Sequence, residues 1–437
     1  MMNIRKIALG LLEEYEAADK YINLSLASHS LDGLSSEQRA VITALLYTTV
    51  ERKITYDYYI SSISARNPDS IDSHTRNILR LGLCQICDMK SVPDFAAVNE
   101  TVKLARNTGE RAFVNGVLRT AVRMKDSLPM PKEEKNYRRY LSVKYSFPLW
   151  IVKLLDIRYG REATEEMLGF FNNEKYTDLT VNTLKISREG YAKKLEECGF
   201  EAEADPNTGN SIRITRSVNP ELLFGFSDGL VFVQDRACQI SAAALAPKAG
   251  DVIVDVCASP GGKSFSAAIL MGDEGEIHSF DLHQSKLSLI INGASRLGIK
   301  SIRVAERDAE RPDELLFNKA DKVICDVPCS GLGVLGKKPD LRYKHEERIK
   351  DLPPLQYSIL EHSVKYLKAG GELIYSTCTL NPAENEDVVT SFLRANPDYE
   401  LVPFTVGGIK SNDGMLTLLP HIHKTDGFFI AKIKRTG

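Results

Sequence analysis

The chain has 437 residues, more than a single hydrophobic core usually supports, so two or three domains are expected. Its 56 Lys and Arg residues nearly balance 58 Asp and Glu residues. The net charge of -2 excludes a global electrostatic attraction to nucleic acid or to an anionic membrane, so any polyanion must bind through local patches.

The N-terminus and the eight cysteines bear on the compartment. The apolar run 7–12 meets Glu13 and Glu14 at once and is too short for a signal peptide. No later stretch is long enough to span a bilayer. Cysteines in a long chain without secretory features are expected to stay reduced. We therefore expect a cytoplasmic protein without a membrane partner, in which each cysteine serves packing or chemistry.

The first expected domain, residues 1–130, is all-helical. Apolar residues recur at intervals of three to four along it, as in Ile4, Ala8 and Leu11. Basic residues lie among them and could face RNA, although such residues more often form a solvated helix face: Arg76, Arg80, Arg106, Arg111, Arg119 and Arg123. Cys84 and Cys87 form a C-x-x-C without a second pair, which favours core packing because zinc needs four ligands.

A proline-containing, charged linker at residues 127–134 precedes a second expected domain, a small α/β module at residues 131–229. It could bind nucleic acid or cap the domain that follows. Its expected elements are helices at 147–159 and 188–198 and strands at 178–184 and 212–214.

Strands and helices alternate through the third expected domain, residues 230–437. The strands are expected at 252–256, 277–280, 302–305, 322–325 and 373–375. Alternation of this kind predicts a Rossmann-like, doubly wound, mostly parallel sheet with helices on both faces.

Acidic residues stand at or near the ends of four of these strands: Asp255, Asp281, Asp308 and Asp326. In a doubly wound sheet, ligands bind outside the carboxyl ends of the strands. One acid at a loop start is ordinary, because Asp favours turns and helix caps. Four acidic residues at corresponding strand ends indicate a binding site.

The loop after the first strand suits a nucleoside cofactor. It consists of Cys257, Ala258, Ser259, Pro260, Gly261, Gly262 and Lys263. Small residues and backbone N–H groups let a ligand approach the main chain closely. Asp281 lies 19 residues after Gly262, near the ~20 expected of an acid that binds a ribose.

The rival interpretation of this loop is a phosphate-binding P-loop, because Gly262, Lys263 and Ser264 match the end of G-x-x-x-x-G-K-[ST]. The first glycine of that motif would stand where Cys257 is, and Pro260 stiffens the loop. We therefore favour the cofactor interpretation.

Two cysteines lie in the loops after the fourth and fifth strands, Cys329 in DVPCSGLG and Cys378 in YSTCTLNPAEN. Asn381 with Glu384 three residues on is typical of a helix N-cap with a capping box, which would hold Cys378 between a strand end and a helix start. A cysteine is more often packing than nucleophile. Two cysteines on adjacent strand-end loops favour a catalytic role. A zinc deaminase is excluded, because the P-C-x-x-C it needs is not completed after Cys329.

Methylation of carbon 5 of a pyrimidine would use such a pair. That carbon is too electron-poor to attack a sulfonium methyl group unaided, but a thiolate added to carbon 6 makes it nucleophilic. A thiol of pKa ~8.5 is mostly protonated, so the site must favour the thiolate. A second cysteine or another base could then assist loss of the carbon 5 proton and of the enzyme thiol. Asp326 could bind cytosine or the cofactor, and the base must be single-stranded or flipped out.

A basic stretch with an aromatic residue follows the Cys329 loop and could contact RNA, or form a solvated loop: Lys337, Lys338, Arg342, Tyr343, Lys344 and His345. Its place beside the expected site favours RNA contact.

Several segments resemble the RNA cytosine-5 methyltransferases of the RsmB, Nop and Sun (Fmu) group. They are DVCASPGGKS, DVPCSGLGVL with KKPDLRY, YSTCTLNPAENEDVV, VFVQDRACQISAAAL with Cys238 where serine is expected, and DGFFIAKIKR. In the helical domain, VPDFAAVNETVKLAR and FVNGVLR resemble the NusB-like domain of the bacterial ribosomal RNA member. The middle segment LTVNTLKISREG fits the same family, so the resemblance covers nearly the whole chain.

The resemblance implies S-adenosylmethionine as cofactor, contacted by residues 257–263, Asp281, Asp308 and Asp326. It implies Cys378 as the nucleophile and Cys329 as the residue that helps release the product, a choice that placement alone leaves open. It implies one cytosine of 16S ribosomal RNA as substrate. We expect a monomeric enzyme without a metal ion. The alternatives are a non-catalytic RNA-binding protein on the same sheet and a P-loop nucleotide hydrolase.

Overall fold

The structure, a computed structural model, describes residues 3–18, 22, 26, 33–173 and 176–437. It divides into two compact units, one made of Met1–Asn172 with Lys337–Lys344 and the other of Asn173–Gly336 with His345–Gly437. Within the described residues, none of the helices combines the length and apolar character that crossing a membrane requires.

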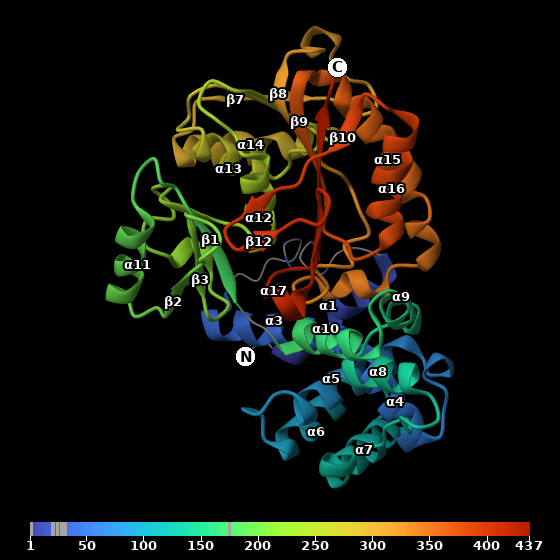
Figure 1. Cartoon of the computed structure of the whole chain (residues 1–437). Coiled ribbons are helices and arrows are strands. Elements are labelled where there is room, and N and C mark those ends of the chain that lie inside the picture. The colour runs from blue at the N-terminus through green and yellow to red at the C-terminus, as the bar shows by residue number, and fades with distance from the viewer. Residues whose placement is uncertain (1–2, 19–21, 23–25, 27–32, 174–175) are drawn as a thin grey trace. The chain divides into compact units, whose positions relative to one another are not determined.

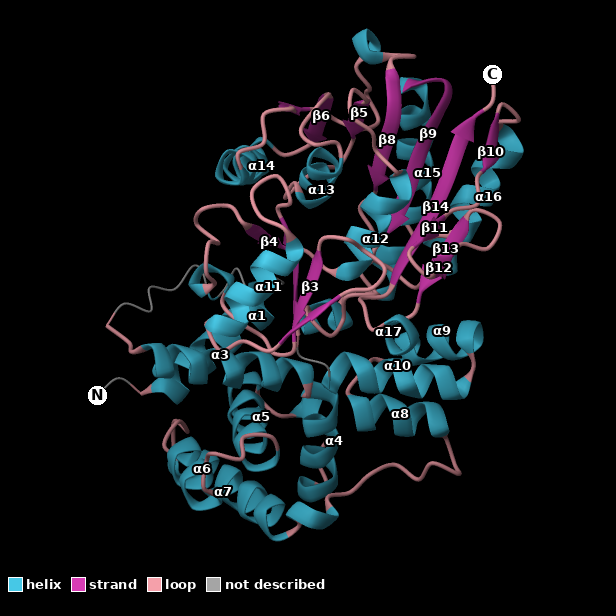
Figure 2. Ribbon diagram, turned by 60° about the vertical axis from the view of Figure 1, so that its left-hand side comes forward, coloured by secondary structure: helices cyan, strands magenta, loops and turns pink. Residues whose placement is uncertain are grey.

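The first unit is helical throughout the part that the structure describes, as the sequence predicts (Figure 2). Its helices are α1 (Ile4–Ala18), α3 (Ser36–Glu51), α4 (Lys53–Ser64), α5 (Ser73–Cys87), α6 (Asp94–Val102), α7 (Thr108–Arg123), α8 (Tyr137–Tyr145), α9 (Leu149–Tyr159) and α10 (Arg161–Asn173). Helix α5 is buried along most of its length, and Cys84 lies in its core, as predicted. Arg80, considered above as an RNA-facing residue, is instead buried and paired with Asp57 and Glu16.

Helices α8 to α10 belong to this unit, although the sequence analysis groups them with the middle module. The start of α4, with Arg52 before it, makes hydrogen bonds to the end of α8 and to Ser146 after it. Arg52 donates a hydrogen bond to the Lys144 carbonyl at 3.0 Å, and the Thr55 hydroxyl donates to the Val143 carbonyl at 2.5 Å. The backbone N–H of Ile54 donates to the Ser146 hydroxyl at 3.0 Å.

The segment Lys337–Lys344 belongs to the helical unit, while the chain on both sides of it belongs to the other unit. It holds a short 3-10 helix, η5 (Pro339–Tyr343). Arg342 is completely buried, and its guanidinium carbon lies 3.8 Å from the centre of the Phe147 ring. It donates a hydrogen bond to Asn172 Oδ1 at 2.8 Å. Burial lowers its pKa to about 10.

The expectation of RNA contact is therefore wrong for Arg342 and Tyr343. Arg342 has no exposed surface, and the Tyr343 hydroxyl donates to the Val50 carbonyl at 2.8 Å, where burial raises the pKa of that hydroxyl to about 12. Both side chains stabilise the helical unit. Lys337 and Lys338 are exposed.

Replacing Arg342 tests this structural role. Arg342→Ala is expected to lower the free energy of unfolding of the helical unit by about 3 kcal/mol, because it removes the stacked guanidinium and leaves the oxygen of Asn172 without its donor. Arg342→Lys should recover only part of the loss, since an ammonium does not stack as a planar group does. Urea unfolding followed by circular dichroism measures both variants, with exposed Lys338→Ala as control. A loss below about 0.5 kcal/mol for Arg342→Ala would contradict the assignment.

The second unit begins with a four-stranded antiparallel sheet of order β2-β3-β1-β4. Its strands are β1 (Thr177–Val181), β2 (Ala202–Ala204), β3 (Ser211–Ile214) and β4 (Val231–Val233), and α11 (Arg188–Glu197) packs on them. Strand β4 lies beyond the boundary expected at residue 229, because it pairs with β1. Gln234 Oε1, just after β4, accepts hydrogen bonds from Thr180 at 2.8 Å and from Ser266 at 2.7 Å, which ties this sheet to the domain that follows.

The larger sheet has eight strands in the order β10-β14-β9-β8-β5-β6-β7, with β13 paired to β14. The strands are β5 (Val252–Asp255), β6 (Glu276–Asp281), β7 (Ile302–Glu306), β8 (Ala320–Asp326), β9 (Leu367–Thr377), β10 (Tyr399–Leu401), β13 (Met415–Leu418) and β14 (Phe428–Arg435). Strands β5 to β9 run parallel, which confirms the predicted doubly wound sheet, and β14 joins β9 antiparallel. The short elements β11 (Thr405–Val406), β12 (Ile409–Lys410) and α17 (Pro420–His423) lie near the C-terminus.

Helices cover both faces of this sheet (Figure 1). One face packs against α12 (Arg236–Leu245), α13 (Gly262–Leu270) and α14 (Gln284–Leu297), and the other against α15 (Leu352–Ser363) and α16 (Glu386–Ala395). Neighbouring strand residues alternate between the two cores: Ile253 joins the first and Val254 the second. Because β5, β6, β8 and β9 are parallel, the loops after them meet at one edge of the sheet.

Candidate active site

The loop after β5 turns sharply into α13. Its Ala258 N–H donates to the Phe280 carbonyl in β6 at 2.7 Å, which holds the loop against the neighbouring strand. Gly261 has a φ of 109°, and a Cβ atom there would lie 2.3 Å from the Phe265 ring, so the turn requires glycine. Gly262 then begins α13, and Lys263 stands in its first turn.

Asp281 ends β6 beside this loop and is 8% exposed. One carboxylate oxygen accepts a hydrogen bond from the Ser259 N–H at 3.3 Å and the other from the His283 N–H at 3.0 Å. Each oxygen has a further lone pair, so the carboxylate can still accept hydrogen bonds from a ribose. The structure thus brings together the predicted loop and the predicted acid.

Asp255 and Asp308 differ from Asp281 in their surroundings. Asp255 is 1% exposed and accepts a hydrogen bond from the Ser264 hydroxyl at 2.7 Å. Burial raises the pKa of Asp255 to about 7. Such surroundings are typical of a carboxyl group that serves the packing of the protein. Asp308 lies two residues beyond β7, and its contacts are with its own loop, the Glu310 N–H at 3.0 Å and Arg311 at 3.9 Å.

Asp326 ends β8 and forms an ion pair with Lys263, with Nζ and Oδ2 2.5 Å apart. Its second oxygen accepts a hydrogen bond from the Ser376 hydroxyl of β9 at 2.8 Å. Burial lowers the pKa of Lys263, but the charge of Asp326 outweighs it and leaves that pKa raised. The same Nζ lies 3.7 Å from Cys238 Sγ and 5.2 Å from the centre of the Phe428 ring. The pairing of Lys263 with Asp326 is not visible in the sequence, which predicts both only as cofactor contacts.

Cys329 and Cys378 lie side by side, with their Sγ atoms 3.1 Å apart and both side chains half-buried. The hydrogen bond to Cys329, together with burial, raises the pKa of Cys378 well above its ordinary value, although Lys263 acts in the opposite direction. Burial likewise raises the pKa of Cys257, which lines the loop after β5. Two loops 49 residues apart in the chain thus present a pair of thiols next to Asp326.

The predicted capping box is only half correct. Asn381 is the N-cap of the 3-10 helix η8 (Pro382–Glu384) and accepts a hydrogen bond from the Ala383 N–H at 3.3 Å. The reciprocal bond is not made, because the Asn381 N–H donates to the Thr379 hydroxyl at 3.3 Å. The Glu384 carboxylate, completely buried, instead accepts hydrogen bonds from both cysteine loops. Sequence reasoning missed this role, since the local pattern suggested a cap.

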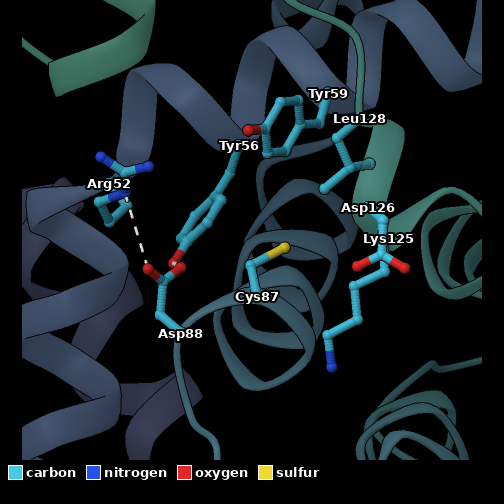
Figure 3. A pocket seen from close by; sticks show the side chains of 8 residues that line it. All are labelled: Arg52, Tyr56, Tyr59, Cys87, Asp88, Lys125, Asp126 and Leu128. Atoms are coloured by element: carbon cyan, nitrogen blue, oxygen red, sulfur yellow. Dashed lines mark hydrogen bonds and ion pairs between the residues drawn. The ribbon is translucent and has the colours of Figure 1, made fainter.

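A further cavity, of about 340 Å³, lies in the helical unit (Figure 3). Its lining residues are Arg52, Tyr56, Tyr59, Cys87, Asp88, Lys125, Asp126 and Leu128. The Tyr56 hydroxyl donates to Asp88 at 2.5 Å, and burial raises the pKa of Cys87 to about 12. Cys87 is therefore a poor candidate for thiolate chemistry or metal binding.

The parallel sheet, the acid-lined loop and the cysteine pair define a Rossmann-like methyltransferase. Residues 242–434 match the family described as 16S rRNA methyltransferase RsmB/F, residues 147–221 the ferredoxin-like domain of RsmF/B-like methyltransferases, and residues 2–123 the NusB family. The chain belongs to the RsmB/F family of 16S ribosomal RNA methyltransferases.

Relatives support this assignment over the full length. Proteins from Synechocystis sp. and Bacillus subtilis, each named probable ribosomal RNA small subunit methyltransferase B, are 36% and 34% identical. The first alignment covers 100% of both chains, and the second covers 100% of this chain and 99% of its relative. A solved methyltransferase homolog from Pyrococcus horikoshii is 29% identical, with a TM-score of 0.60 over 69% of this chain and 99% of that one. The protein is therefore an enzyme, and both alternatives, the non-catalytic RNA-binding protein and the P-loop hydrolase, are rejected.

The buried Asp255 predicts a pH-dependent stability. Its carboxyl group ionises near pH 3.8 in the unfolded chain and near pH 7 in the folded one, so its contribution to stability is full below pH 3.8 and is lost as the pH rises through 7. Asp255→Asn cannot ionise and should match the wild type at pH 4 but exceed its free energy of unfolding at pH 8 by roughly 2 to 4 kcal/mol. Urea unfolding across this range measures the difference, with exposed Asp413→Asn as control. A difference independent of pH would refute the shifted pKa.

Proposed function

We propose that this methyltransferase transfers a methyl group from S-adenosylmethionine to carbon 5 of one cytosine in 16S ribosomal RNA, through a covalent bond between a cysteine and carbon 6. The observation that carries the proposal is the pair Cys329 and Cys378, 3.1 Å apart at the edge of the sheet where Asp326 also lies. Thiol addition to the base makes carbon 5 nucleophilic.

The donor set of the loop fits the proposed cofactor. The loop residues 257–263, Asp281, Asp308 and Asp326 would hold it, with the Asp281 carboxylate accepting hydrogen bonds from the ribose hydroxyls. When bound, S-adenosylmethionine supplies an electrophilic methyl group on a sulfonium. Lys263 and Asp326 form an ion pair with Nζ and Oδ2 2.5 Å apart. The loop after β5 and the loop after β8 can therefore lie next to each other without an unpaired buried charge.

Cys378 is proposed as the nucleophile. Its raised pKa means that its thiol keeps the proton in the free enzyme, so bound RNA must favour the thiolate or a neighbouring base must take the proton. The Cys378 sulfur would bond to carbon 6, and the electron pair of the 5,6 double bond would make carbon 5 nucleophilic toward the methyl group that the cofactor would supply, with the electron pair of the methyl–sulfur bond staying on the cofactor's sulfur. Asp326 would orient the cytosine by its amino group and nitrogen 3.

Cys329 is proposed to assist product release. After methyl transfer, a base near the ring would take the proton from carbon 5, the electron pair of that C–H bond would restore the 5,6 double bond, and the Cys378 sulfur would leave carbon 6 with the electron pair of the S–C bond. Cys329 Sγ lies 3.1 Å from the sulfur that must leave and can exchange a proton with it or with a base nearby. The target base must be single-stranded or flipped out.

The other two parts of the chain are proposed to present the RNA. The NusB-like helical unit and the ferredoxin-like module would bind 16S ribosomal RNA around the target cytosine. The enzyme would act as a monomer in the cytoplasm, and the proposed chemistry requires no metal ion.

Labelled S-adenosylmethionine tests the reaction. The wild type is expected to transfer label to 16S ribosomal RNA, and nucleoside analysis should find it in 5-methylcytosine. Asp281→Ala should weaken cofactor binding by tenfold or more, as measured by calorimetry, because it removes a charged hydrogen-bond acceptor. Asp413→Asn, an exposed position, is the control. Label in another nucleoside, or in no RNA at all, would reject the proposal.

Alanine variants separate the roles of the two cysteines. Cys378→Ala is expected to give neither methylation nor a protein–RNA adduct, because no bond to carbon 6 can form. Cys329→Ala should methylate the base but accumulate the covalent complex, visible as a shifted band in a denaturing gel. The opposite pattern would exchange the two roles, and adducts with neither variant would remove the covalent step.

A further inference from the structure

The carboxylate of Glu384 holds both cysteine loops at once. Its Oε2 accepts hydrogen bonds from the Ser330 N–H at 2.8 Å and from Gln356 Nε2 at 3.1 Å. Its Oε1 accepts from the Ser330 hydroxyl at 2.6 Å, from Asn381 Nδ2 at 2.9 Å and from the Thr379 hydroxyl at 3.4 Å. Ser330 follows Cys329 directly, and Thr379 follows Cys378.

The hydrogen bonds around Glu384 also connect the two cysteine loops to each other. Ser330 and Thr379 are also linked to each other, with their hydroxyl oxygens 2.7 Å apart, so the residues that follow the two cysteines form one network around a single carboxylate. Glu384 is completely buried, and a buried carboxylate is costly unless donors satisfy it. All five of its donors are neutral groups, and four of them belong to the two cysteine loops, while the fifth, Gln356, lies in α15.

The next residue, Asn385, adds a second clamp on one cysteine. The Thr377 hydroxyl donates to Asn385 Oδ1 at 2.5 Å, and Asn385 Nδ2 donates to the Thr379 carbonyl at 3.0 Å. Cys378 is therefore held on both flanks. The Cys329 loop joins the same assembly through the Gly333 N–H, which donates to the Cys378 carbonyl at 2.9 Å.

We propose that Glu384 is a positioning residue that sets the distance between Cys329 and Cys378, and so the rate of the reaction for which both thiols are needed. The proposal rests on the proposed function for its effect on catalysis. Its geometric part concerns only the two sulfur atoms and stands without RNA. A displacement of about 1 Å at reacting groups can cost 100-fold in rate, so small movements of either loop matter.

Glu384→Gln is the sharpest variant. Three of the five donors are N–H groups: the Ser330 N–H and Gln356 Nε2 donate to Oε2, and Asn381 Nδ2 donates to Oε1. Whichever way the new amide turns, its NH₂ faces at least one of them, and the loop that this donor belongs to must move. Asp387→Asn, an exposed carboxylate in the first turn of α16, is the matched control.

Disulfide formation reports the distance between the sulfurs without substrate. Diamide accepts two protons and two electrons as the two thiols join, and mass spectrometry of the linked peptides gives the rate of formation of the Cys329–Cys378 disulfide. Glu384→Gln is expected to slow this reaction and to lower kcat for methylation roughly 10- to 100-fold. Cofactor affinity and KM for RNA should stay within about twofold, and Asp387→Asn should behave as the wild type.

The remaining outcomes for Glu384→Gln decide whether this residue sets the distance between the two sulfurs. Thermal unfolding and cofactor binding first establish that Glu384→Gln is folded; if it is not, Ser330→Ala, which removes one donor to Glu384 and the link to Thr379, should show the same two effects at smaller size. A folded variant with unchanged disulfide rate, or with slowed disulfide formation and unchanged kcat, overturns the proposal. If the wild type methylates no RNA, the proposed function fails, while the disulfide rates still decide whether Glu384 sets the distance.

Discussion

The ion pair between Lys263 and Asp326 joins the two halves of the candidate site. Lys263 stands in the first turn of α13, after β5, and Asp326 ends β8, the parallel neighbour of β5. Parallel neighbours end at the same edge, so the two side chains reach each other across adjacent loops. Lys263 is 9% exposed, and a cation so buried is costly without its partner. The cofactor loop and the Cys329 loop therefore hold their places together, and the rest of the site is arranged around that pair.

Much of this arrangement follows from local patterns. Short apolar strands alternating with helical segments predict a parallel sheet, and the structure has five parallel strands where these patterns lie. Once the sheet is parallel, the acids and cysteines after its strands must lie near one another. This reasoning places Asp281, Asp326, Cys329 and Cys378 correctly because each position depends on its distance from a strand end, which the sequence displays.

Interactions between distant segments could not be predicted in this way. Glu384 lies three residues after Asn381, so a local rule assigns it to a cap, yet its shortest hydrogen bond, 2.6 Å, comes from Ser330, 54 residues away. Arg342 lies in a basic stretch that suggests solvent and RNA, yet it donates to Asn172, 170 residues away, and stacks on Phe147. In both cases a charged side chain satisfies buried groups of another segment. Sequence spacing carries no signal for such partners.

The two cysteine loops are almost equivalent, which explains why placement alone does not assign their roles. Asp326 of β8 is in register with Ser376 of β9, so Cys329 and Cys378 follow their strands at nearly the same depth. The supports are equivalent as well. Asn385 bonds to Thr377 and Thr379 on the two flanks of Cys378. On the flanks of Cys329, Gln356 Nε2 donates to the Pro328 carbonyl at 2.9 Å and the Ser330 N–H donates to Glu384 at 2.8 Å. A nucleophile must approach carbon 6 along a narrow path, and both thiols are held firmly enough for that. Because position and support are alike for the two sulfurs, the geometry favours neither of them for bond formation.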